Sequence, residues 1–235
     1  MPAIKFIPAP EFKEKFEVFG FFYDLEGRKN LRYRALLEIM RKDGAQQRKN
    51  ILTTDPKLPK IDAVVVMMNP GSSRPLGEDS QNYYSNHAEA SRNILKEKLV
   101  PTKPDPTQYQ VERLMEYYKW NRVRVLNLSD IREPKSGKFY RWISEERNEH
   151  SFFSESRKKV LEKMIPEKVT VIAGWGMEEK LFPLITMAER FLKRRGNEIV
   201  GDQTGCSSFY FRHPSPPIIQ RRLNWLNEVI GKMGE

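Results

Sequence analysis

The sequence predicts a mixed α/β domain, with a mostly parallel central sheet between two layers of helices. Short apolar runs of strand length alternate along the chain with amphipathic segments of helix length, which is the pattern of such three-layer folds. The runs at 63–68, 123–127, 169–173 and 208–211 each end in a polar or glycine-containing signature. Because the carboxyl ends of parallel strands meet at one edge of a sheet, where ligands bind, we expect these signatures to lie close together.

The first 60 residues are less regular and form a predicted N-terminal extension (1–60) to the main domain (61–235). The aromatic stretch 16–23 alternates in a way that favours a strand or hairpin. Residues 31–42 have helix-like apolar spacing, and 55–59 has the proline content of a linker turn. We expect this extension to pack on the edge of the sheet rather than to fold by itself.

From residue 61 onward, strands and helices alternate. An Asp-Pro-Thr sequence begins one of these helices at Asp105, since proline suits a first helical turn. A long polar stretch at 69–87, a loop at 101–106 and a polar connection at 129–152, with room for a short helix, separate the predicted elements. The predicted strands are 62–68, 122–128, 168–173, 197–200 and 207–212, and the predicted helices are 88–98, 105–120, 154–164, 177–195 and 217–232.

Composition narrows the class of protein and of partner. The chain has 235 residues, which is enough for one large core, and no apolar run approaches the roughly 20 residues that span a bilayer. The N-terminus lacks the apolar core of a signal peptide, so we expect a cytoplasmic monomer without a membrane partner. The net charge of +10 favours a polyanionic partner such as nucleic acid, although a generally basic surface is the simpler interpretation.

Metal and redox chemistry are not expected. The single cysteine, Cys206, excludes an intramolecular disulfide and a thiolate cluster. The three histidines, His87, His150 and His213, have no metal-ligand spacing, although carboxylates can still hold a magnesium ion. We therefore expect no cofactor.

The first two signatures offer amides at strand ends. In Asn69-Pro70-Gly71-Ser72, proline ends the strand and glycine lets a ligand approach the backbone, although the same residues make an ordinary turn. Asn127 lies in an apolar run, and a buried amide must find partners or cost about 1–3 kcal/mol. It therefore either ties down a neighbouring loop or hydrogen-bonds a ligand.

The last two signatures differ in character. Gly174-Trp175-Gly176 suits close packing between a strand and a helix, which is the preferred interpretation of that motif by itself. His213 ends a predicted strand, and Ser215 is expected to cap a helix begun by Pro216 and Pro217, which makes a phosphate site. The alternative is that His213 is a structural histidine.

Taken in order, the signatures resemble the motifs of the uracil-DNA glycosylase superfamily. That superfamily has Asp-Pro or Asn-Pro-Gly after its first strand, an asparagine closing the next, Trp-Gly after the third and His-Pro-Ser-Pro after the fourth. The matching motifs here, within roughly residues 60–233, are Asn69-Pro70-Gly71, Asn127, Trp175-Gly176 and His213-Pro214-Ser215-Pro216.

The chain also resembles, more closely, a mainly bacterial family called domain of unknown function 1643. That family has no established activity. The motifs that carry this resemblance are Met68-Asn69-Pro70-Gly71, Asp105-Pro106-Thr107, Leu126-Asn127-Leu128, Trp175-Gly176 and Arg212-His213-Pro214.

The glycosylase resemblance implies a DNA-repair hydrolase that cleaves the N-glycosidic bond of a damaged or deaminated base, of the uracil or mismatch type. The base would be flipped out of the duplex into a pocket. Asn69 and His213 would be catalytic, the first positioning a water and the second stabilising negative charge on the departing base. The implied substrate-binding residues are Pro70, Gly71, Ser72, Tyr83, Tyr84, Asn127, Trp175 and Ser215, with Tyr83 and Tyr84 as candidates for stacking on the base.

Two departures from the glycosylase pattern leave alternatives open. Met67 stands where the superfamily usually has glycine, and Asn69 replaces the aspartate of the most efficient branch, as in the mismatch-specific branch. The single cysteine excludes the iron–sulfur branches. The alternatives are a non-catalytic protein that binds nucleic acid or a nucleotide in the same cleft, and a different hydrolase that acts on a nucleoside or nucleotide.

Overall fold

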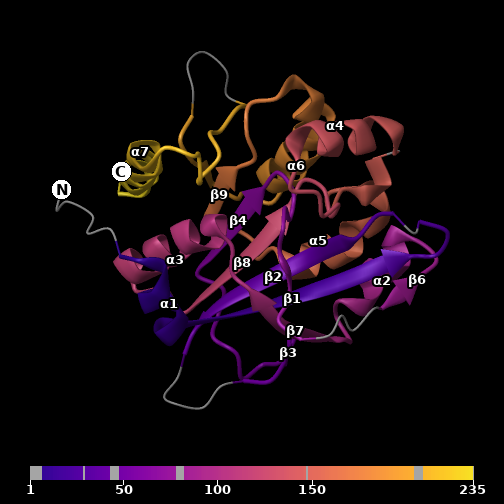
Figure 1. Cartoon of the computed structure of the whole chain (residues 1–235), viewed down its shortest axis with the longest axis horizontal. Coiled ribbons are helices and arrows are strands. Elements are labelled where there is room, and N and C mark those ends of the chain that lie inside the picture. The colour runs from indigo at the N-terminus through magenta and orange to yellow at the C-terminus, as the bar shows by residue number, and fades with distance from the viewer. Residues whose placement is uncertain are drawn as a thin grey trace.

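The computed structural model describes residues 7–28, 30–42, 48–77, 82–146, 148–203 and 209–234, and its elements are labelled in Figure 1. The helices in these ranges are α1 (Ala9–Lys15), α2 (His87–Asn93), α3 (Pro106–Tyr118), α4 (Ser136–Glu145), α5 (Lys158–Met164), α6 (Phe182–Arg194) and α7 (Ile219–Met233). The strands are β1 (Phe16–Leu25), β2 (Tyr33–Arg41), β3 (Ile51–Leu52), β4 (Ala63–Met67), β5 (Arg74–Pro75), β6 (Tyr83–Tyr84), β7 (Lys98–Lys103), β8 (Arg122–Asn127), β9 (Val171–Gly174) and β10 (Ile199–Val200).

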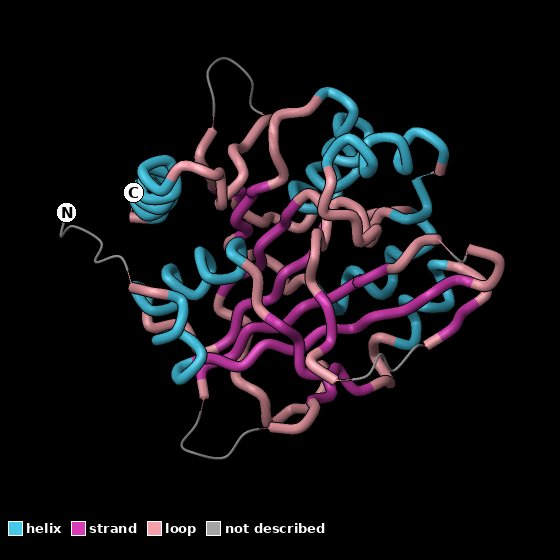
Figure 2. Tube along the Cα trace, in the orientation of Figure 1, coloured by secondary structure: helices cyan, strands magenta, loops and turns pink. Residues whose placement is uncertain are grey.

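The strands form one mixed sheet in the order β10-β9-β4-β8-β2-β1-β7-β3, with β5 and β6 paired at its margin. Figure 2 shows these strands crossing the middle of the molecule, with helices around them. Strands β10, β9, β4 and β8 are parallel to one another, whereas the pairs β8-β2, β2-β1, β1-β7 and β7-β3 are antiparallel. The α/β class is confirmed, but the prediction of a mostly parallel sheet is wrong, because the parallel part ends at β8.

The antiparallel part begins with β2, where a helix was predicted over 31–42. Residues Tyr33–Arg41 lie between β1 and β8, and apolar side chains on both faces of this strand are buried. Its fully buried Glu38 accepts hydrogen bonds from Arg122 and Arg124 of β8. Burial raises the pKa of Glu38, but the two guanidinium groups outweigh it and hold that pKa below its ordinary value. A helix cannot make this pairing, so tertiary contacts override the local spacing.

Two apolar clusters lie on opposite faces of the sheet, because successive strand residues point to opposite sides. Val65, for example, belongs to the cluster that α1, α3 and α7 cover. Val64 and Val66 belong to the other cluster, which α2, α4, α5 and α6 cover. The N-terminal strands β1 and β2 contribute to both clusters, so they are built into the same packed core as the parallel strands.

Most other predicted elements appear with shifted ends. The predicted helix at 105–120 is α3, which begins with a full capping box between Asp105 and Gln108. The loop predicted at 101–106 instead contains the end of β7. The strand predicted over 207–212 is wrong for 209–212, where only Phe211 makes isolated bridges; residues 207 and 208 lie outside the described residues. None of the described helices has the length and apolar character that crossing a bilayer requires.

Candidate functional site

The three central parallel strands end at the same level of the sheet. Met67 of β4 lies opposite Asn127 of β8 on one side and Gly174 of β9 on the other. The residues that follow each strand are therefore side by side, although more than 100 positions separate the first from the last in sequence. A cleft of about 540 Å³ opens at this edge of the sheet.

This cleft gathers all of the predicted site residues except Tyr83 and Tyr84. The predicted residues that line it are Asn69, Pro70, Gly71, Ser72, Asn127, Trp175, His213 and Ser215. Tyr83 and Tyr84 form β6, which pairs with the end of β1, and Tyr84 packs on Phe21. They lie outside the cleft because β5 and β6, which follow the Asn69 turn, pair with β7 and β1 at the margin of the sheet.

Asn69 ties together the two loops that follow β4 and β8. Its side-chain nitrogen donates hydrogen bonds to the carbonyl oxygens of Ile131, at 3.2 Å, and Glu133, at 2.7 Å. Two residues later Gly71 has φ +57°, in the left-handed region that favours glycine, so the chain turns sharply beside the cleft. Asn69 thus performs the loop-tying role that the sequence analysis considered for Asn127.

Asn127 closes β8 at the wall of the cleft. The residue is fully buried behind the surface of the cleft, and it lies opposite Met67 of the neighbouring strand β4. An amide offers two donors and one acceptor oxygen. At this position those groups are held rigidly by the central strand, which is what hydrogen-bonding recognition of a planar ligand requires.

Trp175 is a packing residue. It is fully buried, its indole nitrogen donates to the carbonyl oxygen of Phe209 at 2.8 Å, and its ring meets Phe211 edge-on. The preceding Gly174 faces Pro214 so closely that an added Cβ would lie 2.8 Å from the proline Cδ. These contacts bring the 209–215 segment against the end of β9 and so carry His213 to the cleft.

His213 is partly exposed in the cleft, and its protonation state follows from its contacts. Its Nδ1 accepts a hydrogen bond from the backbone N–H of Ser215 at 3.2 Å. Burial lowers the pKa of His213 below its ordinary value, although the nearby Asp105 carboxylate opposes that shift. The imidazole is therefore neutral at neutral pH, and because Nδ1 accepts, the ring proton is on Nε2. The Nε2–H group is the donor that remains for a ligand.

The predicted serine cap is wrong. Helix α7 begins at Ile219, and no side chain caps its first turn. Ser215 lies in the loop before the helix, and its backbone N–H donates a hydrogen bond to His213. The serine still lines the cleft, but it does so without a helix N-terminus behind it.

The cleft residues that sequence analysis did not predict include Arg34, Asp105 and Gln108. The Asp105 carboxylate accepts from the backbone of Thr107 and Gln108, which fixes the first turn of α3 against the cleft. Arg34 comes from β2, and burial lowers its pKa to about 10 although Asp105 opposes the shift. The Asp-Pro-Thr sequence marked Asp105 as a helix start, whereas Arg34 was hidden by the mistaken helix.

The cleft holds groups of both signs but no cluster typical of a metal site. In the part of the chain that the structure describes, no three histidine, cysteine, aspartate or glutamate side chains are grouped to hold a metal ion. Comparison with protein families, with curated proteins and with solved structures finds no match to this chain.

Proposed function

We propose that this chain has a three-layer fold of the uracil-DNA glycosylase type and cleaves the N-glycosidic bond of a damaged or deaminated base in nucleic acid. The strand order β8-β4-β9-β10, with helices packed on both faces, supports the fold. One observation carries the function: the Nε2–H donor of His213 and the buried amide of Asn127 line the same cleft.

The cleft has the hydrogen-bonding groups for a flipped base. An enzyme that acts on a base must take it out of the stack and hold it by its polar edge. The Asn127 amide lines the cleft at the position where it can contact that edge. The neutral His213 donates from Nε2 to an oxygen of the base as negative charge develops on it, and one such preorganised donor is typically worth about 3–4 kcal/mol of barrier.

Asn69 has the weaker role of orienting a water molecule. Its nitrogen is engaged by the loop oxygens of Ile131 and Glu133, which fixes the orientation of the amide at the cleft. An amide is not a base and cannot take a proton from water. The proposed reaction is therefore slow unless the departing base is a good leaving group.

The net charge of +10 supports a nucleic-acid substrate. Lysine and arginine contacts to phosphates release counterions, so binding should weaken steeply as salt is raised. Ser72 and Ser215 lie at the cleft and are suited to hydrogen-bond the phosphates that flank the flipped base.

A non-catalytic binding protein is the second candidate, and one observation favours it. The Asn69 nitrogen is used to tie two loops, and the position carries no carboxylate to activate water. In that case the same cleft binds a base or nucleotide without releasing it, and His213 contributes to affinity rather than to rate.

The test is base release from labelled duplex and single-stranded DNA carrying uracil, hypoxanthine, xanthine or a mismatch, scored by alkaline cleavage at abasic sites. We expect release from at least one substrate, and a loss of about 100-fold or more in single-turnover rate for His213→Ala, the scale of losing one transition-state donor. Because His213 is partly exposed, its replacement should change the melting temperature little.

The neighbouring Arg212→Gln variant is the control, since Arg212 pairs with Asp202 outside the cleft. It should retain base release. Absence of release from every substrate, with binding that H213A weakens, would replace the glycosylase proposal by the binding protein. Unchanged release in H213A would remove the proposed role of the histidine.

A further inference from the structure

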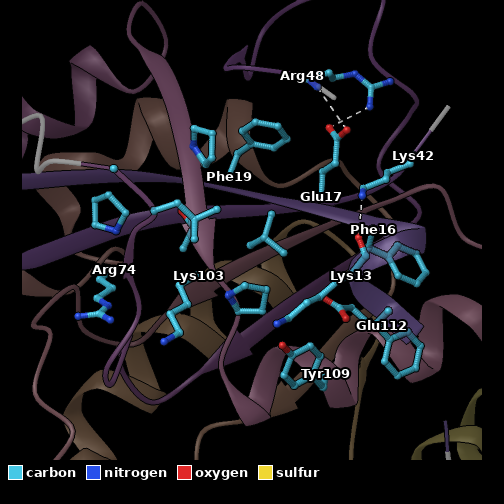
Figure 3. A pocket seen from close by; sticks show the side chains of 18 of the residues that line it. Lys13, Phe16, Glu17, Phe19, Lys42, Arg48, Arg74, Lys103, Tyr109 and Glu112 are labelled. Carbon is cyan, nitrogen blue, oxygen red and sulfur yellow. Dashed lines mark hydrogen bonds and ion pairs between the residues drawn. The ribbon is translucent and has the colours of Figure 1, made fainter. Parts of the chain in front are cut away.

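A second and larger concave region borders the cleft along the first turns of α3. This groove has a volume of about 840 Å³ and runs between α1, α3 and the strands β1, β5 and β7 (Figure 3). Asp105, Gln108 and Val111 of α3 line the cleft, whereas Tyr109 and Glu112 line the groove. Because residues three and four apart share one side of a helix, Gln108 and Glu112 are neighbours there, so the two sites adjoin along the first turns of α3.

The groove is strongly basic. Glu17 is paired with Arg48, which leaves an excess of positive charge, and Lys13, Arg74 and Lys103 make no ion pair with any described carboxylate. Figure 3 shows these three side chains along one margin of the groove. The cationic residues of the lining are Lys13, Lys42, Arg48, Arg74, Lys103 and Arg132.

The wall also contains a buried acid with an unused oxygen. Glu112 is 1% exposed, and its Oε2 has no hydrogen-bond partner in the described part of the chain. Burial raises its pKa to about 8, with Arg113 opposing the shift and Asp105 adding to it. The carboxyl is therefore protonated at neutral pH, when it both donates and accepts a hydrogen bond. Leaving such a group unpaired costs about 1–3 kcal/mol, which a ligand can recover.

Apolar surface completes the lining. Pro101, Pro104 and Tyr109 are partly exposed in the groove, and Leu76 at its margin is 64% exposed. Flat proline and tyrosine surfaces favour contact with a planar ring rather than with a flexible chain. The groove volume is within the range of about 300–1,000 Å³ that ligand sites of small molecules occupy.

We infer that this groove is a second binding site, which takes a nucleotide unit with its phosphate toward Lys13, Arg74 and Lys103 and its ring toward Tyr109, Pro101 and Pro104. The Glu112 carboxyl exchanges hydrogen bonds with the sugar or base. The unit has two sources, a free mononucleotide or one nucleotide of a single strand. This inference goes beyond base release and does not depend on it.

The position of the groove is consistent with a strand that continues from the cleft. The two sites meet at consecutive residues of the chain. Pro104 lines the groove and the next residue, Asp105, lines the cleft. In the same way, Arg132 lines the groove and Glu133 lines the cleft. Arg132 also donates to the carbonyl oxygen of Ser73 at 2.7 Å, which holds the loop after β4 beside the groove. A nucleic acid held by one of its bases in the cleft thus has a basic path beside it.

The experiment measures binding of adenosine 5′-monophosphate by calorimetry and of a labelled single-stranded oligothymidylate by fluorescence anisotropy, neither of which offers a base to excise. The test variant is K13A/K103A. The matched control is K159A/K163A, which removes two equally exposed lysines from α5, on the other face of the sheet. Both variants lose the same charge, so they separate a local site from a general attraction.

We expect K13A/K103A to weaken binding about tenfold or more, while the control binds nearly as the wild type does. The slope of log affinity against log salt concentration for the oligonucleotide should fall by the equivalent of about one to two phosphate contacts. If K13A/K103A weakens the binding of both probes, the groove binds a free nucleotide. If it weakens the binding of the oligonucleotide alone, the groove binds a nucleotide of a single strand. Equal loss in the two variants, or no binding of either probe at low salt, overturns the inference. Because H213A leaves the groove intact, binding that persists in H213A separates this site from the proposed function.

Discussion

Replacing Glu112 with glutamine should stabilise the fold increasingly as pH rises from about 5 to about 9. Glutamine keeps the size and hydrogen-bonding capacity of the protonated acid but cannot ionise. The folded-state pKa of Glu112 is raised by burial to about 8, so the folded protein keeps a proton that the unfolded chain releases above its ordinary value of 4.5. Stability of the wild type is therefore lost as pH rises between these two values.

The size of the effect follows from that pKa. A rise from 4.5 to about 8 corresponds to about 5 kcal/mol between the two protonation states, at about 1.4 kcal/mol per unit. This figure is an upper limit, because a fold that relaxes or admits water reduces the cost of the buried charge. We expect the advantage of E112Q to be about 1 kcal/mol or less near pH 5 and several kcal/mol near pH 9.

The assay is urea unfolding of both proteins across this pH range, without nucleotide, followed by tryptophan fluorescence. Glu116, one turn further along α3, supplies a control of opposite sign. Burial alone would raise the pKa of Glu116, but hydrogen bonds from Arg41, Lys119 and Lys15 outweigh it and lower that pKa to about 2. E116Q should therefore destabilise the fold above about pH 4.5, where the ionised carboxylate is stabilising.

A difference between E112Q and wild type that is constant with pH would refute the reasoning. It would mean that Glu112 titrates alike in the folded and unfolded chain, and hence that the carboxyl is not held neutral in the groove wall. Destabilisation by E112Q that grows with pH would show instead that the ionised carboxylate is paired.

Two further outcomes follow from packing and from burial. G174A should cost about 1–3 kcal/mol of unfolding free energy, because its Cβ would lie 2.8 Å from Pro214 Cδ; thermal unfolding measures this, and an unchanged melting temperature would show that the close approach is not needed. Burial lowers the pKa of His150 to about 4. The unfolded chain therefore gains a proton on this histidine before the folded protein does, and stability should be lost as pH falls from about 6.5 to about 4. H150Q should make this acid dependence shallower in urea unfolding, whereas an identical slope would show that His150 is not buried in its neutral form.

Much of the site was predictable because its residues follow strands. Apolar runs of five or six residues bounded by proline or glycine are strong local signals, and the order of three of them placed Asn69, Asn127 and Trp175 at one sheet edge before any contact was known. Their roles were less predictable. Asn69 turned out to tie loops and Trp175 to pack in the core, because a side chain's partners come from distant segments such as Ile131 and Phe209.

The wrong predictions concern residues whose structure depends on contacts with distant segments. Tyr33–Arg41 has a spacing that suits a helix, and only its position between β1 and β8 makes it a strand. Arg34 was overlooked with it. Tyr83 was a candidate for stacking on the base through the glycosylase resemblance, but pairing with β1 takes it away from the cleft. Nothing near Glu112 in sequence indicates that its carboxyl is buried beside a groove.

The amino-acid sequence by itself determined the alternation of strands and helices, the residues that end the parallel strands and the basic charge, since these depend on local periodicity and composition. Only the tertiary structure decided the antiparallel half of the sheet, the Nε2–H tautomer of His213 and the basic groove between α1 and α3. Each of these depends on which distant groups exclude water from a side chain or hydrogen-bond to it. Burial and hydrogen bonding by distant groups decide whether a segment forms a strand and which way a pKa shifts. The residues next to that position in the sequence do not determine either of them.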